Sequence, residues 1–193
     1  TAVGAGNVVT DNPWGGIRLE GGQNNAVLGN RVYDNAEYNI DIIPNVGPNL
    51  NDTLDIDQGP NKGQNYPEIV SATLNGMNLQ FAGKLRSRAN TQYRVEYFQT
   101  PTCHTSGFGQ GRSYIGHEVV MTSGAGEASL GFLGSNGQNS GYVTATATDP
   151  DGNTSEYGNC VAIGAPTAGE FNFMAYWQYS WEDFGVAEVF VTR

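Results

Sequence analysis

Oxygen-bearing side chains alternate around a glycine in the segment Asp149-Pro-Asp151-Gly-Asn153. Carboxylate and amide oxygens at this spacing are typical of the first half of a calcium-binding loop. The downstream glutamate that would bind the ion through both oxygens is not at the required distance. The alternative is a hairpin turn in which the Asp and Asn side chains accept hydrogen bonds from backbone N–H groups. The sequence leaves both interpretations open.

A second set of candidate calcium ligands, Asp52, Asp55 and Asp57, lies in the segment 47–66. Pro, Gly, Asn and Asp dominate this segment, so we expect a linker without regular structure. Calcium bound there would rigidify the junction between the segments on either side. Calcium is the one cofactor that the sequence suggests.

The first 46 residues hold several carboxylates that could form an acid–base pair for glycoside hydrolysis: Asp11, Glu20, Asp34, Glu37 and Asp41. Asp11 and Asp34 occupy equivalent positions of an internal repeat, which favours a structural role. Two repeats also make too short a groove for several sugar units. We therefore expect no enzymatic activity and assign no catalytic residue.

The repeat itself spans GNVVTDNPWGGIRL at 6–19 and GNRVYDNAEYNIDI at 29–42, with a constant offset of 23 residues. A fixed period of this size indicates stacked units that cover one another's apolar faces. The pattern resembles the coils of right-handed parallel β-helix proteins, so we expect β-helix coils over 1–46. With about two units, at least one end of the stack needs a cover.

Composition and charge restrict the fold and the partners. The 193 residues include 27 Gly and 10 Tyr, and only 15% are charged. No segment has a sustained apolar stripe of helical period, so we expect an all-β protein. The net charge of −10 argues against binding to nucleic acid or to an anionic membrane surface. No apolar run is long enough to span a bilayer.

The segment 67–164 has the alternation and turn signals of consecutive strands. We place these strands near 67–74, 77–83, 91–99, 113–121, 125–133, 141–149 and 156–163, and expect an immunoglobulin-like β-sandwich. The motifs at 59–67, 93–103, 106–116 and 143–160 resemble a module that follows β-helix repeats in very large bacterial surface proteins. That resemblance implies a non-catalytic, secreted or cell-surface protein.

The two cysteines, Cys103 and Cys160, have no metal-ligand spacing. They form either a disulfide, as in exported proteins, or two free buried thiols. Closing the loop between them would stabilise the fold by about 4 kcal/mol in the chain-entropy model.

The last segment, 165–193, has a spaced pattern of Phe171, Phe173, Tyr179, Glu182, Gly185, Ala187, Val189, Val191 and Arg193. This pattern resembles the opening hairpin of a Calx-β domain, although the complete domain would need more strands. It adds unusual aromatic bulk, which favours a buried interface. The expected interface residues are Phe171, Phe173, Tyr176, Trp177, Tyr179, Trp181, Val189 and Val191.

Unfinished β-structure at both ends of the chain suggests self-association. We expect a structural subunit of an exported bacterial filament or surface assembly, in which the C-terminal strands pair head-to-tail with a neighbouring chain. The expected receiving surface lies around Ile17, Leu19 and Val27. Alternatively, the chain is a piece of a longer protein, or the hairpin folds back on its own body. A glycan-binding adhesive module of a giant secreted protein is the other functional interpretation.

Overall fold

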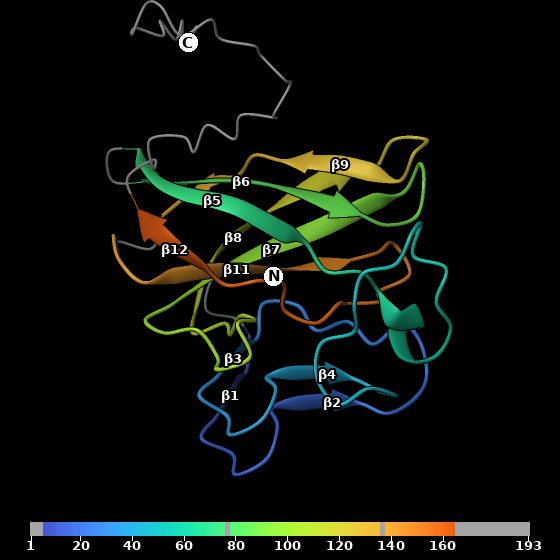
Figure 1. The fold of residues 1–193 in the computed structure, drawn as a ribbon, viewed down its shortest axis with the longest axis horizontal. Coiled ribbons are helices and arrows are strands. Elements are labelled where there is room, and N and C mark those ends of the chain that lie inside the picture. The colour runs from blue at the N-terminus through green and yellow to red at the C-terminus, as the bar shows by residue number, and fades with distance from the viewer. Residues whose placement is uncertain (1–5, 76–77, 136–137, 165–193) are drawn as a thin grey trace, which may run out of the picture.

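The computed structural model describes residues 6–75, 78–135 and 138–164, so the segment 165–193 with the predicted interface lies outside the described residues. The described part is all-β, as the composition predicts. It consists of the strands β1–β12 and one single-turn 3₁₀ helix, η1 (Pro60–Gly63). Figure 1 shows two regions in contact, a stack of short strands and a larger sheet, which we call the body.

The repeat forms two parallel strand pairs. Strand β1 (Val8–Thr10) pairs with β3 (Arg31–Tyr33), and β2 (Ile17–Leu19) pairs with β4 (Ile40–Ile42). Val9 lies opposite Val32 and Ile17 opposite Ile40, so the predicted offset of 23 residues sets the register. We call residues 6–28 the first coil and residues 29–51 the second coil.

Asparagine side chains connect the two coils at equivalent turns, as the sequence predicts. The backbone N–H and the Nδ2 group of Asn7 both donate to Asn30 Oδ1, at 2.9 and 3.0 Å. Asn12 binds Asn35 Oδ1 in the same way, at 3.2 and 2.7 Å. Each amide therefore satisfies backbone and side-chain donors of the preceding coil at once.

The body is one nearly closed sheet with the order β10-β6-β5-β12-β11-β7-β8, and β9 pairs with the outer side of β6 and lies near β8. All of its pairings are antiparallel except that of β12 with β5. The two-sheet arrangement of an immunoglobulin-like sandwich stays a prediction. The bounds are β5 (Glu68–Asn75), β6 (Asn78–Arg86), β7 (Gln92–Thr100), β8 (Ser113–Met121), β9 (Glu127–Leu130), β10 (Leu133–Gly134), β11 (Tyr142–Thr148) and β12 (Val161–Gly164).

The main core lies inside the curved sheet. Alternate residues of β7 and β11 point inward and pack against apolar residues of β5 and β6, as the two-residue period of a strand requires. Its fully buried members include Phe81, Leu85, Tyr93, Val95, Tyr97, Val143, Ala145 and Ala147.

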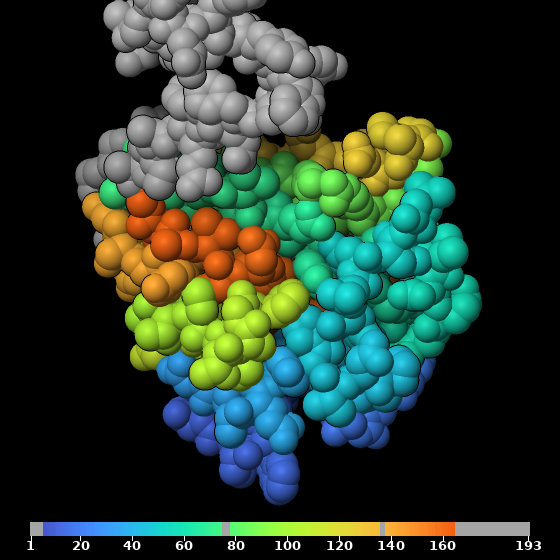
Figure 2. All heavy atoms as spheres, viewed as in Figure 1, coloured from blue at the N-terminus to red at the C-terminus, as the bar shows by residue number. Residues whose placement is uncertain are grey.

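The other face of β7 and β11 is buried as well. Their alternating sequences predict strands with one face in water, but Glu96, Phe98 and Thr146 are at most 1% exposed. The coil stack packs on this face, as Figures 1 and 2 show. A second core forms there from Val27, Val32, Ile40, Phe98, Tyr114 and Tyr157. The body and the second coil therefore share one interior.

The close approach of the coils depends on Gly16. A Cβ atom at this position would lie 2.5 Å from both Val32 Cγ1 and Asn39 O. We expect Gly16→Ala to lower the free energy of unfolding by about 1–3 kcal/mol, because the added methyl group would clash with Val32 and Asn39 and push the coils apart. Urea denaturation measures this change.

Gly21 provides the matched control, since a Cβ atom there would meet nothing within 4 Å. Gly21→Ala should leave the unfolding free energy almost unchanged. Equal stabilities of the two variants would contradict the tight coil stacking described above.

Candidate functional site

Two buried glutamates of the body bind backbone N–H groups on the side of the second coil that faces away from the first. Glu156 accepts hydrogen bonds from Ile42 N through Oε1 (2.9 Å) and from Asn49 N through Oε2 (2.6 Å). Glu96 accepts one from Gly29 N through Oε2 (2.7 Å), and its Oε1 forms an ion pair with Arg94 (2.8 Å). A carboxylate has only acceptors, so it suits a surface of unpaired donors.

The body continues the hydrogen-bond pattern of the coils at this junction. Asp11 N donates to Asp34 O (3.1 Å), and Asp34 N donates in turn to Gln110 Oε1 (2.8 Å). Gly111 N donates to Val32 O (2.8 Å). Gln110 and Gly111 thus occupy the place of a third coil. One end of the stack is therefore sealed by the body.

Burial raises the pKa of Glu156 to about 7, although the N–H groups of Ile42 and Asn49 partly oppose the shift. Asp41 adds a smaller increase through charge repulsion. Little in the sequence predicts this role for the two glutamates. Glu156 follows the candidate calcium loop by three residues, and Glu96 is one polar residue of an alternating strand.

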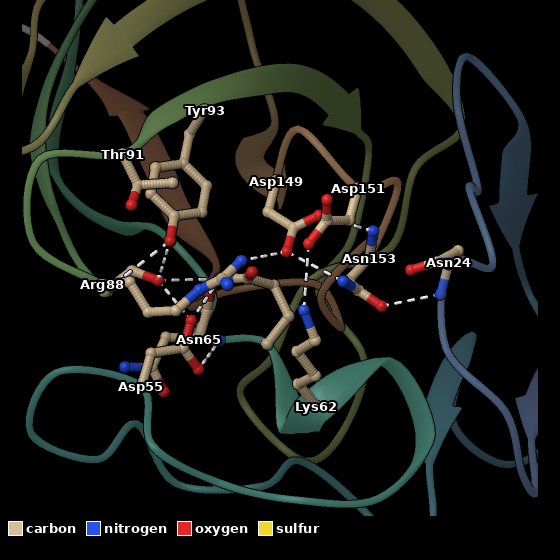
Figure 3. Close-up of polar contacts among 12 residues, drawn as sticks. Asn24, Asp55, Lys62, Asn65, Arg88, Thr91, Tyr93, Asp149, Asp151 and Asn153 are labelled. Atoms are coloured by element: carbon tan, nitrogen blue, oxygen red, sulfur yellow. Dashed lines mark hydrogen bonds and ion pairs between the residues drawn. The ribbon is translucent and has the colours of Figure 1, made fainter.

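The predicted calcium loop is a hairpin turn tied to protein partners (Figure 3). Asp149 accepts hydrogen bonds from Asn153 N (2.9 Å) and Asn153 Nδ2 (2.8 Å), and it also forms an ion pair with Arg88. Asp151 lies 3.0 Å from Lys62 Nζ. These contacts match the turn alternative, and calcium binding there stays a prediction.

The linker carboxylates also serve separate contacts. Asp55 is buried and accepts hydrogen bonds from Gln64 Nε2 (2.7 Å), Asn65 N (3.1 Å) and the Ser87 hydroxyl, and burial raises its pKa to about 6. Asp52 Oδ2 accepts one from Ile56 N (3.1 Å), whereas Asp57 is exposed. Within the described ranges, no three His, Cys, Asp or Glu side chains are placed to hold a metal ion together.

The predicted disulfide is confirmed. Cys103 and Cys160 are bonded, with their Cα atoms 5.9 Å apart. The bond joins the loop after β7 to the segment before β12. That loop leads to Gln110 and Gly111, so the disulfide helps to hold the residues that seal the second coil.

The other end of the stack differs. In the part of the chain that the structure describes, β1 and β2 each pair on one side only. Glu37 N donates to Trp14 O (3.3 Å), so the repeat places the equivalent N–H of Trp14 on the outer side of the first coil. Pro13 stands where Ala36 N donates to Asn12 O (3.0 Å), and it lacks the N–H. The outer edge is thus open at both strands and partly blocked at this turn.

The predicted receiving surface needs one correction. Val27 is 9% exposed, and its N–H donates to Thr154 Oγ1 at 2.9 Å. It therefore belongs to the junction with the body. Ile17 and Leu19 are partly exposed, and Val8 on β1 is 45% exposed.

The carboxylates considered for acid–base chemistry have structural contacts. Asp11 and Asp34 adopt the same left-handed backbone conformation, with φ of 58° and 51°. Asp34 pairs with Arg112 (2.8 Å), and the buried Asp41 accepts a hydrogen bond from Gly47 N (3.0 Å). The structure thus places Asp11 and Asp34 as repeat equivalents.

No known protein-family model matches the sequence, and a comparison with curated proteins finds no match. Among the described residues, no helix is long and apolar enough to cross a membrane.

The buried Glu156 should make stability depend on pH. In the folded protein the Glu156 carboxyl group keeps its proton up to about pH 7, whereas in the unfolded chain it releases the proton near pH 4.5. The stabilising contribution is therefore complete below pH 4.5 and is lost as pH rises through 7. In the native protein the loss of this contribution lowers the free energy of unfolding by ~3 kcal/mol between pH 4.5 and 7. We expect Glu156→Gln to remove that decrease, measured by urea denaturation at several pH values in this interval.

The raised pKa of Asp55 also makes the unfolding free energy fall as pH rises. The difference between the native protein and Glu156→Gln therefore isolates the contribution of Glu156. Glu20→Gln is the matched control, because the Glu20 side chain is 75% exposed. Parallel pH curves for the native protein and Glu156→Gln would contradict the assignment.

Proposed function

We propose that the protein is a non-catalytic structural subunit of an exported bacterial surface or filament assembly. In this proposal the coils begin a right-handed parallel β-helix, and the body is an immunoglobulin-like module that caps it. Chains associate head-to-tail when strands from residues 171–191 of one chain add to the outer edge of the first coil of the next.

The observation that carries the proposal is the difference between the two ends of the coil stack. Glu96 and Glu156 satisfy donors of the second coil, whereas β1 and β2 pair on one side only within the described ranges. Unpaired strand edges are templates for another strand. The stack therefore has one end whose hydrogen-bond donors are satisfied and one end whose strand edges are open, which supports strand addition at the first coil.

The position of β12 supports a head-to-tail arrangement. The segment 165–193 follows β12, whose end points away from β1 and β2 in Figure 1. Strand donation and strand reception would then use opposite ends of the molecule. An interface formed by two different surfaces generates an open chain of subunits when the rotation does not close.

The sequence of 171–191 supports its role as the donated segment. Aromatic residues dominate 171–181, and five of the six residues in 186–191 are apolar. A two-stranded hairpin alone is marginally stable in water, so such a segment gains from pairing with an existing strand.

Light scattering on the full chain tests this function. We expect assemblies larger than a monomer, and we expect a monomer after deletion of 170–193. Val8→Lys should give the same loss, because a lysine on an exposed edge strand disfavours strand addition.

Val70→Lys is the matched control, since Val70 is 70% exposed on β5, which is paired on both sides. This variant should assemble normally. A monomeric full-length chain, or assembly that survives both the deletion and Val8→Lys, would overturn the proposal.

A further inference from the structure

The side of the coil stack carries a small hollow of about 220 Å³. The two coils contribute equally to its walls. Glu37 N donates to Trp14 O (3.3 Å) and Gly16 N to Tyr38 O (2.9 Å), so neighbouring turns are stacked there. The hollow therefore crosses the boundary between the coils and is distinct from the outer edge of the first coil. Its lining residues are Trp14, Gly15, Arg18, Glu37, Tyr38 and Asp41.

Two aromatic side chains give the hollow an apolar wall. Trp14 is 72% exposed and belongs to neither of the two apolar cores. Tyr38 is held in place from two sides. Its ring lies 5.4 Å from the His104 ring, and a Cβ atom at Gly47 would come within 2.6 Å of the Tyr38 hydroxyl oxygen. The exposed Trp14 and the fixed Tyr38 thus each offer the hollow an aromatic side chain with a polar tip.

Charged groups surround this aromatic wall. Arg18 Nε lies 3.5 Å from Glu20 Oε1 and 3.8 Å from Asp41 Oδ2. The Asp41 side chain is 9% exposed, and its other oxygen accepts a hydrogen bond from Gly47 N (3.0 Å). Glu37 is exposed at the rim. Arg18 thus supplies donors to the hollow and Glu37 and Asp41 supply acceptors, and Asp41 is fixed before any ligand arrives.

This combination matches the chemistry of a sugar ring. One face of a pyranose presents C–H groups that can pack on an aromatic ring, and its rim presents hydroxyl groups. Each hydroxyl both donates and accepts, so it can bind a guanidinium and a carboxylate together. The hollow is smaller than the roughly 300–1,000 Å³ of typical small-molecule pockets, which suits a single ring.

The charge around the hollow selects among sugars. Of the described residues that line the hollow, one is a cation, Arg18, and two are acidic, Glu37 and Asp41. The whole chain carries a net charge of −10. An acidic sugar would be repelled by this field, whereas a neutral sugar would not.

We propose that the hollow between Trp14 and Tyr38 binds one neutral sugar residue of a glycan. This site lies on the side of the coil stack, whereas strand addition would use the outer edge of the first coil. The proposal uses none of the aromatic residues of 171–181.

NMR titration of the full chain with neutral oligosaccharides of glucose, mannose and N-acetylglucosamine tests the proposal. The Trp14 indole N–H resonance is assigned by its absence in Trp14→Phe. We expect at least one neutral sugar to shift this resonance, and Trp14→Ala to weaken binding about tenfold or more. Arg18→Met, which retains the aliphatic stem, should also weaken binding. An oligogalacturonate should bind less tightly than the neutral sugar.

Trp177→Ala and Trp181→Ala are the matched controls and should bind the sugar as the native chain does. Three results would overturn the proposal: no shift of Trp14 with any neutral sugar, binding unaffected by Trp14→Ala, or preference for the acidic sugar. Light scattering of Trp14→Ala keeps the two proposals distinguishable, since its assembly should be normal whether or not sugar binds.

Discussion

The structure depends on how the backbone N–H groups of the second coil are satisfied. In a stack of parallel coils each coil exchanges hydrogen bonds with its neighbours, as Asp11 N to Asp34 O and Ala36 N to Asn12 O do here. A last coil would leave the donors on its free side without partners. Here Glu96 and Glu156 of the body take that place. A buried donor without a partner costs about 1–3 kcal/mol. The coil stack therefore depends on the body, which supplies acceptors for the buried N–H groups of the second coil.

The dependence runs in both directions. The coil stack covers the face of β7 that carries Glu96 and Phe98, both of which are at most 1% exposed. Without the coils, this face of the sheet would be exposed to water and Glu96 would lose Gly29 as a donor. The buried carboxylates are tolerated because charge-assisted hydrogen bonds compensate part of their desolvation. We infer that the coils and the body fold as one cooperative unit.

The sequence predicted the features that depend on local pattern. The 23-residue offset predicted the register of β1 with β3 and of β2 with β4, and turn signals predicted most strands of the body to within three residues. The strand predicted at 156–163 begins only at Val161, as β12. The predicted strand 125–133 is split, since β9 ends at Leu130 and β10 begins at Leu133. The cysteine pairing was one of two interpretations that the sequence allowed, and the structure decides it.

The features that depend on contacts between distant segments could not be predicted. Alternation along β7 shows that Glu96 faces away from the main core, but it does not show that a coil covers that face. Asp55 and Asp149 are the residue types that bind calcium, yet Ser87 and Arg88 occupy them in the folded protein. Val27 has the pattern of a coil residue, but Thr154 from a turn 127 residues away binds its N–H. In each case the partner is distant in sequence.

Native-state hydrogen exchange, read by NMR at single amides, tests the central claim most directly. If the body replaces a third coil, the amides of Gly29, Asp34, Ile42 and Asn49 should be protected as strongly as those of β7, with which they would open together. The outward amide of Trp14 should exchange rapidly in the unassembled chain. Rapid exchange at Gly29 and Ile42, while β7 stays protected, would show that the coils open independently and would contradict the account.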